Sequence, residues 1–215
     1  KMALRRWTGG AQAIAQVATV TITNTWQTGD TATLTINGKD LTVTVGDDVT
    51  VTEVALLIKE AWEGTTPTDT AASYTSAGGG PDIAECSVVT ATSAAGVVTL
   101  TADTAGVPFV VTESVVTATT GDAAVGVGTA CTGPNYFDNA DNWDGAVPVS
   151  TDDVFFDNSD VSLLYALGQS AITLTSLTIG ANYTGDIGLP KTNPAGYIEY
   201  QNDYLEISAT TVQIG

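Results

Sequence analysis

The chain contains no histidine among its 215 residues. Histidine is the commonest general base of enzymes and the commonest metal ligand of proteins, so Ser-His-Asp triads, Cys-His pairs and histidine-based zinc sites are excluded within this chain. Cysteine is also scarce: Cys86 and Cys131 are too few for a disulfide scaffold and lack the spacing of metal ligands. Two isolated buried thiols are expected, with one Cys86–Cys131 disulfide as the alternative for a protein that works outside a cell.

Basic residues are few. Six Lys and Arg stand against 24 Asp and Glu, which gives a net charge of −18. This balance excludes a basic nucleic-acid footprint and a polybasic membrane anchor, and it favours solubility in a saline or extracellular setting. Lys1, Arg5 and Arg6 supply half of the positive charge. Residues 1–16 are therefore predicted to be a basic arm, which either is pinned to an acidic neighbour through Arg5, Arg6 and Trp7 or is frayed.

Long apolar runs are missing as well. The segment Ala11–Val20 is interrupted by Gln12 and Gln16, so it does not resemble the core of a secretory signal, and no run approaches membrane-spanning length. We therefore expect no membrane insertion. A protein of this kind that acts outside the cell would leave it by a route such as lysis of the host.

Alternating apolar and β-branched polar residues dominate the first half of the chain, as is typical of half-buried strands. Asn37-Gly38 predicts a type I′ hairpin turn, because both central residues of that turn have positive φ. The predicted strands are Val17–Thr23, Thr31–Ile36, Lys39–Val45, Cys86–Thr92, Gly96–Ala102 and Val107–Val116.

A helix is predicted over about residues 51–63. Thr50 and Glu53 fit the Thr-x-x-Glu capping box, and Gly64 suits the left-handed position that follows a helix. Residues 17–116 are thus predicted to form a β-rich α+β module with this one helix. Residues 117–134 are rich in Ala, Gly and Thr and are predicted to be a linker, with a loosely held strand as the alternative.

Residues 135–215 show short strand-like segments that end in Gly, Asn or Asp. Ile172–Ile179 alternates strictly before Gly180, and Thr210–Ile214 repeats that ending before Gly215. The recurrence predicts the coils of a right-handed β-helix-like solenoid, and a second β-sandwich is the competing interpretation. Because the last strand carries no sign of a cap, we expect the domain to continue beyond Gly215 or another chain to cover its end. Further strands are predicted at Asp153–Phe156, Val161–Tyr165, Asp186–Leu189 and Tyr197–Tyr200.

The segment from Asn135 to Asn158 joins the two architectures and is rich in aspartate. Calcium would suit such oxygen ligands, but the three-residue spacing of Asp138, Asp141 and Asp144 does not match an EF-hand loop. Asx turns at the entry to a solenoid explain these residues without a metal. No catalytic, cofactor-binding or metal residue is therefore assigned, and no cofactor is expected. Seven aspartates are concerned, six within the segment and one just after it: Asp138, Asp141, Asp144, Asp152, Asp153, Asp157 and Asp160.

The same segment carries a resemblance. Asn142-Trp143-x-Gly145-x-x-Pro148, followed by Asp152-x-Val154-x-Phe156, resembles the start of β-helical regions in bacterial surface proteins and phage-encoded fibres, with Trp143 as an apolar plug over the first coil. With Leu174–Ile179, Tyr183–Pro190, Tyr197–Tyr204 and Thr210–Gly215, it resembles uncharacterised virion structural proteins of tailed phages and prophages, notably of planctomycete-type bacteria. Gly29–Gly38, Val98–Ala102 and Gly106–Phe109 resemble β-rich modules of phage virion proteins.

This resemblance implies a non-enzymatic bacteriophage virion structural protein, either a capsid decoration or a tail fibre or adhesin component. The expected partners are other virion proteins, further copies of the chain in a homo-oligomer such as a trimer, and a host surface glycan or receptor. The expected location is the virion, with no nucleic acid bound. The alternatives are a secreted bacterial surface adhesin or surface-layer module, and a carbohydrate-degrading tailspike, which would need paired carboxylates in an exposed groove.

Overall fold

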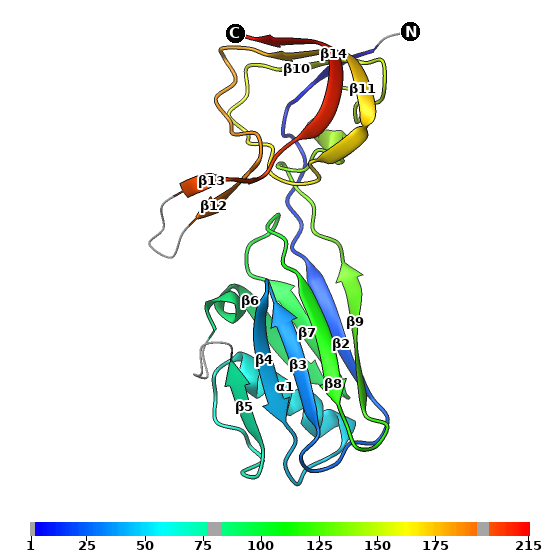
Figure 1. The fold of residues 1–215 in the computed structure, drawn as a ribbon, viewed down its shortest axis with the longest axis vertical. Coiled ribbons are helices and arrows are strands. Elements are labelled where there is room, and N and C mark those ends of the chain that lie inside the picture. Colours follow the sequence, from blue (N-terminus) through cyan, green and yellow to red (C-terminus); the bar gives the residue numbers. More distant parts are fainter. Residues whose placement is uncertain (1–2, 77–82, 193–197) are drawn as a thin grey trace. The chain divides into compact units, whose positions relative to one another are not determined.

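The computed structural model describes residues 3–76, 83–192 and 198–215. These residues are mainly β, with one α-helix among them (Figure 1). The chain divides into two compact units. We call Ala15–Cys131 the antiparallel unit, and Lys1–Ile14 together with Thr132–Gly215 the parallel unit, after the sheets that they contain.

The antiparallel unit holds two four-stranded sheets in which every neighbouring pair runs antiparallel. The first sheet has the order β6 (Val89–Ala94), β7 (Val97–Ala102), β2 (Val17–Thr23) and β9 (Asp122–Thr129). The second has the order β5 (Ser73–Ser76), β4 (Lys39–Thr44), β3 (Thr31–Ile36) and β8 (Val111–Val116). Burial alternates along β2 and β3 as predicted, so the apolar faces form one core.

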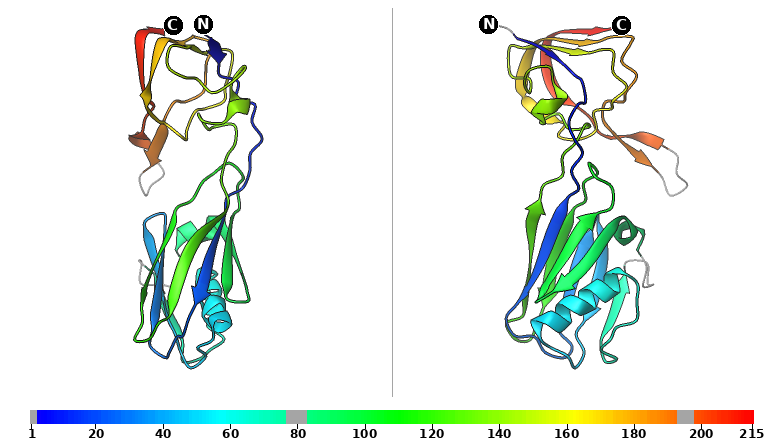
Figure 2. Two further views of the ribbon diagram at one scale, coloured as in Figure 1. Left: turned by 90° about the vertical axis from the view of Figure 1, so that its right-hand side faces the viewer. Right: turned by 180° about the vertical axis from the view of Figure 1, so that it is seen from behind.

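The predicted helix is confirmed as α1 (Val51–Trp62), which packs on β2, β6 and β7 (Figure 2). The N–H of Glu53 donates to Thr50 Oγ1 at 3.3 Å, and the N–H of Thr50 donates to Glu53 Oε2 at 2.9 Å. Gly64 has φ of +67°, as expected after a helix end. The capping box thus fixes the start of α1, and its buried stripe joins the core.

The predicted hairpin turn is also confirmed. Asn37 and Gly38 have φ of 47° and 81°, and the flanking residues Ile36 and Lys39 pair across β3 and β4. These positive values are the ones that a type I′ turn needs.

The prediction of a linker over residues 117–134 is wrong. Residues Asp122–Thr129 form β9, which pairs with β2 along its whole length. A Cβ on Gly128 would lie 3.2 Å from Val17 Cγ1 and 3.3 Å from the Val17 carbonyl oxygen. The small residues that suggest a linker therefore allow β9 to approach β2 closely, and the alternative of a strand holds.

Two smaller differences concern the same unit. β5 lies in a stretch that carries no strand prediction, and Ala84–Val88 is a 3₁₀ helix, η1, so that the strand predicted from Cys86 begins at Val89. Cys86 is buried and Cys131 half-buried, and no disulfide joins them.

The parallel unit is built on a four-stranded sheet in which each neighbouring pair is parallel. Its order is β1 (Leu4–Arg6), β10 (Asp153–Phe156), β11 (Gly168–Ile179) and β14 (Glu206–Ile214). The strands of a β-sandwich pair antiparallel, so this sheet does not have the pairing of the competing interpretation. Since β1 belongs to the sheet, the N-terminal arm is pinned rather than frayed.

Other predicted strands of this unit appear in reduced form. Tyr136 with Tyr165, and Leu163 with Ile187, form isolated parallel bridges in place of strands over Val161–Tyr165 and Asp186–Leu189. The strand predicted from Tyr197 begins at Ile198, since Tyr197 lies outside the described residues. The antiparallel pair β12 (Leu189–Thr192) and β13 (Ile198–Asp203) forms a separate two-stranded ribbon, and η2 (Ala140–Asn142) is a short 3₁₀ helix.

An aromatic cluster forms the core of the parallel unit. Trp143 lies edge-on to Trp7, Phe137 and Phe156, with ring centroids 5.1, 5.0 and 5.7 Å away. Its Nε1 donates to the Phe137 carbonyl at 2.7 Å, so the indole is both buried and hydrogen-bonded. No helix in the described part of the chain is long and apolar enough to cross a membrane.

Candidate functional site

Three aspartates of the Asn135–Asn158 segment, Asp152, Asp153 and Asp157, serve the structure of the parallel unit, whereas Asp138, Asp141 and Asp144 are exposed. Asp152 is buried, and its carboxylate accepts from Arg5 Nε at 3.1 Å and from the backbone N–H groups of Ala3 and Val149, each at 3.2 Å. Desolvation acts to raise the pKa of Asp152, but the hydrogen bonds from Val149 and Arg5 outweigh it and hold that pKa below its ordinary value. Asp152 therefore ties β1 to the loop before β10.

Further aspartates make similar contacts. Asp157 forms an ion pair with Arg6, and Asp153 Oδ1 accepts from the hydroxyl of Ser176 on the next strand. Among the residues that the structure describes, no three Cys, Asp or Glu side chains gather in a way that could hold a metal ion. The geometry thus gives these carboxylates roles in joining neighbouring strands.

Asn142 opens the Asn142-Trp143 motif of the sequence, which gave it no role of its own, and it proves to be a structural residue. It is fully buried: Nδ2 donates to the carbonyls of Gly133 and Tyr136 at 2.8 Å each, and Oδ1 accepts from the N–H of Ala11 at 2.9 Å. Asn142 thus satisfies three buried backbone groups from distant stretches of the chain, which its place in the sequence does not reveal.

Cys86 is the clearest candidate nucleophile by residue type, and its surroundings make it unreactive. Burial, with a smaller contribution from Glu85, raises the pKa of the Cys86 thiol to about 12. The thiol is therefore protonated at neutral pH, whereas a nucleophilic cysteine needs its thiolate.

The two outer strands of the parallel sheet, β1 and β14, differ in what covers them. Along one column of aligned residues, Val154 is 1% exposed, Leu177 is 9% exposed and Val212 is 57% exposed. Arg5 of β1 occupies the position next to Val154, and its guanidinium is paired with Asp152. This column therefore ends in an ion pair at β1 and in an exposed valine side chain at β14.

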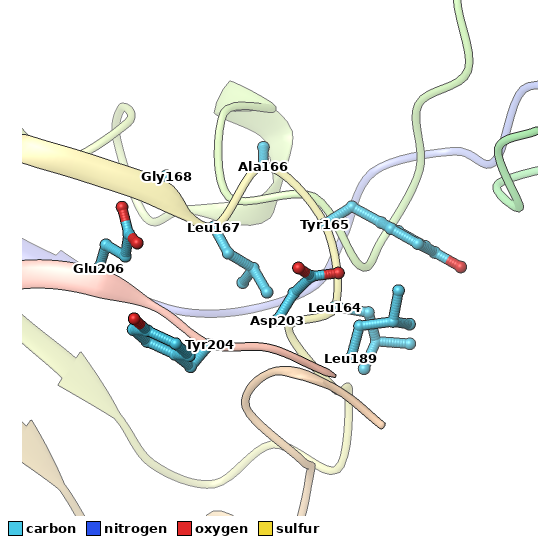
Figure 3. Close-up of a pocket in the computed structure, with 9 residues that line it drawn as sticks. All are labelled: Leu164, Tyr165, Ala166, Leu167, Gly168, Leu189, Asp203, Tyr204 and Glu206. Carbon is cyan, nitrogen blue, oxygen red and sulfur yellow. The ribbon is translucent and has the colours of Figure 1, made fainter. Parts of the chain in front are cut away.

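A pocket of about 340 Å³ lies beside the first residues of β11 and β14 (Figure 3). Leu164, Leu167 and Leu189 give it apolar walls, and the carboxylates of Asp203 and Glu206 also line it. Tyr204, between these two acids, is 64% exposed. An apolar pocket with a few polar groups and an exposed aromatic ring is suited to a small polar ligand.

No residue of this pocket was predicted as a site. Its lining comes from residues 164–168, 189 and 203–206, which are far apart in the sequence and meet only when the strands pair. The local signal was Tyr204 flanked by two acids, in a chain where acids are too numerous to be informative.

No family model matches the chain, and no curated protein matches it.

Proposed function

We propose that the chain is a non-enzymatic structural protein of a bacteriophage particle, either a capsid decoration or a component of a tail fibre or adhesin. The observation that carries this proposal is the in-register parallel sheet with one closed end. Such a sheet supports a β-solenoid, a rod-like fold in which each coil rests on the one before it. Proteins of that kind act by cohesion and persistence, which is what a particle component needs.

Contacts outside the strands support the solenoid part of the proposal. Asn182 Nδ2 donates to Asn158 Oδ1 at 3.2 Å, and the N–H of Asp186 donates to Ser162 Oγ at 2.9 Å. Both pairs are 24 residues apart, close to the 23 residues that separate Ser176 from its partner Asp153 in the sheet. The corner contacts therefore have nearly the same spacing as the pairing of β10 with β11, as expected for two successive coils of a solenoid, whereas Ile179 and its partner Ile214 on β14 are 35 residues apart.

The basic arm is not assigned to attachment, because Arg5 and Arg6 form ion pairs with Asp152 and Asp157 inside the parallel unit. The antiparallel unit is thus the part that we assign to attachment, and the solenoid is the part that projects.

Quantitative mass spectrometry of purified particles tests this function directly. Hundreds of copies per particle are expected for a capsid decoration, and a few to dozens for a fibre. Absence of the chain from particles would overturn the proposal and favour a secreted surface adhesin or surface-layer module.

A second candidate function, glycan attachment, is favoured by the pocket in Figure 3. The face of Tyr204 can stack on a sugar ring, and the carboxylates of Asp203 and Glu206 can accept hydrogen bonds from its hydroxyls. Binding of host surface polysaccharide, lost in Tyr204→Ala and kept in Tyr204→Phe, which retains the face of the ring, would support attachment. Release of new reducing ends from that polysaccharide would instead indicate a degrading tailspike, for which the two carboxylates would be the acid and base.

A further inference from the structure

The hairpin turn between β3 and β4 presents an asparagine and a glycine side by side on an open surface. Asn37-Gly38 is the single Asn-Gly pair in the 215 residues of the chain. Both residues are exposed, and a Cβ built on Gly38 would meet no atom within 4 Å. Because glycine carries no side chain, its backbone nitrogen is the one least hindered in approaching the side-chain carbonyl carbon of the preceding residue.

The groups that such an approach involves are suitably placed around this turn. A β-turn is closed between its first and fourth residues, here Ile36 and Lys39, so the N–H of Gly38 takes no part in that bond. The N–H of Val110 donates to Asn37 Oδ1 at 2.9 Å, which puts a donor where negative charge develops when the carbonyl carbon is attacked. Asn37 Nδ2 has no hydrogen-bond partner among the described residues, so it is free to leave.

We propose that Asn37 is a site of spontaneous covalent modification. The nitrogen of Gly38 forms a bond to Asn37 Cγ, the bond between Cγ and Nδ2 breaks, and Nδ2 leaves as ammonia with the proton that Gly38 gives up. One molecule of water then opens the five-membered imide at either of its two carbonyls. The product at position 37 is isoaspartate or aspartate, and the reaction consumes only water.

Isoaspartate at this position separates the β3–β4 hairpin from the stretch before β8. In the unmodified chain Asn37 exchanges two hydrogen bonds with Val110, because its own N–H also donates to the Val110 carbonyl at 2.9 Å. Isoaspartate adds one carbon to the backbone of a two-residue turn, whose geometry depends on the φ values of both residues. We therefore expect the Val110 amide to lose its acceptor. This consequence concerns the antiparallel unit alone and does not rest on the proposed function.

Peptide mapping by mass spectrometry, after incubation of the chain at mildly alkaline pH, tests the reaction. Asn158 is the internal control, since it is also exposed, has φ of 49° and accepts a hydrogen bond at Oδ1, but is followed by Ser159. We expect conversion at Asn37 to be at least about tenfold faster than at Asn158. Equal rates at the two asparagines, or an Asn37 that stays unconverted, would overturn the proposal.

Hydrogen exchange on the same samples tests the consequence for Val110. Its amide should exchange faster in the isoaspartate fraction than in fresh protein. Asn37→Ala should show the fast exchange from the start and no change on incubation, because it lacks both the reactive amide and the acceptor. Unchanged exchange of the Val110 amide in the isoaspartate fraction would contradict the separation of the hairpin from β8.

The turn at Ala95-Gly96 supplies the matched comparison, because its φ values of 48° and 82° nearly equal those of the Asn37-Gly38 turn. Asn37→Ala therefore gives a pair that this fold already contains in a hairpin, and its circular dichroism spectrum should be unchanged. Ala95→Asn creates a second Asn-Gly pair at a buried glycine, where a Cβ would lie 3.0 Å from Val51 Cγ2. Conversion there should be slower than at Asn37. If both pairs reacted equally fast, the open surroundings of Gly38 would have no part in the reaction.

Discussion

Trp143 is the residue on which the core of the parallel unit depends most. It touches Trp7, Phe137 and Phe156, which come from three separate stretches of the chain, and it is 4% exposed. Trp143→Ala should reduce the free energy of unfolding of this unit by about 3–5 kcal/mol, since truncating a buried tryptophan leaves a cavity. Urea unfolding followed by tryptophan fluorescence and circular dichroism measures the change.

Trp26→Ala is the control for that experiment. Trp26 is as deeply buried as Trp143 but belongs to the antiparallel core, so its loss should destabilise the other unit. If Trp143→Ala left the stability of the parallel unit unchanged, the aromatic cluster would not be the centre of its core.

The lowered pKa of Asp152 predicts that the stability of the parallel unit depends on pH. Its pKa is lowered in the folded chain, so its carboxylate contributes stability above the unfolded pKa of about 3.9, and that contribution is lost as the pH falls through the folded pKa. Asp152→Asn should therefore cost about 1–3 kcal/mol at neutral pH, where the hydrogen bonds to the charged group are lost. The difference from the unchanged chain should shrink under acidic conditions.

Thermal unfolding at a series of pH values measures this difference. Asp144→Asn is a suitable control, because Asp144 is an exposed aspartate of the same segment. A penalty for Asp152→Asn that stayed constant into strong acid would show that the charge of Asp152 has no part in fixing β1.

At the scale of elements, β9 is the strand that local sequence describes least well. Gly128 lies close to Val17, so a larger side chain there would require Val17 or β9 to shift. Gly128→Val should therefore cost about 1–3 kcal/mol through overpacking, even though valine favours strands. Val127→Thr, at a neighbouring residue that is 81% exposed, should change stability by less than about 0.5 kcal/mol. If the two variants were equally stable in urea, β9 would not be closely packed on β2, and a linker would be the better description of residues 117–134.

Elements with local signals were predicted well. The capping box at Thr50 and Glu53, the Asn37-Gly38 turn and the alternation of β3 depend on residues within a few positions of one another. β9 and β5 carry no comparable signal, because each exists only through pairing with a strand that is distant in the sequence. Their prediction would have required knowledge of the partner strand.

At the scale of the whole molecule, the described chain contains two hydrophobic cores with no residue in common. We expect two unfolding transitions in calorimetry, one for each core. Leu34→Ala and Leu174→Ala form a matched pair, since each leucine is 1% exposed in its own core. Each substitution should cost about 2–5 kcal/mol and lower one transition while leaving the other in place. A single transition that both variants shift equally would contradict two independent cores.

Several features of the molecule were determined by the sequence itself. Missing histidine, scarce cysteine and net acidity exclude whole classes of chemistry, and they do so whatever the fold. The recurrence of Ile179-Gly180 and Ile214-Gly215 predicted positions that are indeed neighbours in the parallel sheet. Composition and local periodicity carry this information because each depends on nearby residues alone.

Other features were decided by the tertiary structure. The run of aspartates offers oxygen ligands of the kind that calcium prefers, and it is the approach of Arg5 and Arg6 from the other end of the chain that gives Asp152 and Asp157 their partners. The ion pair beside β1 and the pocket beside Tyr204 likewise arise where distant segments meet. Sequence spacing does not contain these contacts, because their energies depend on burial and geometry that exist only once the strands have paired.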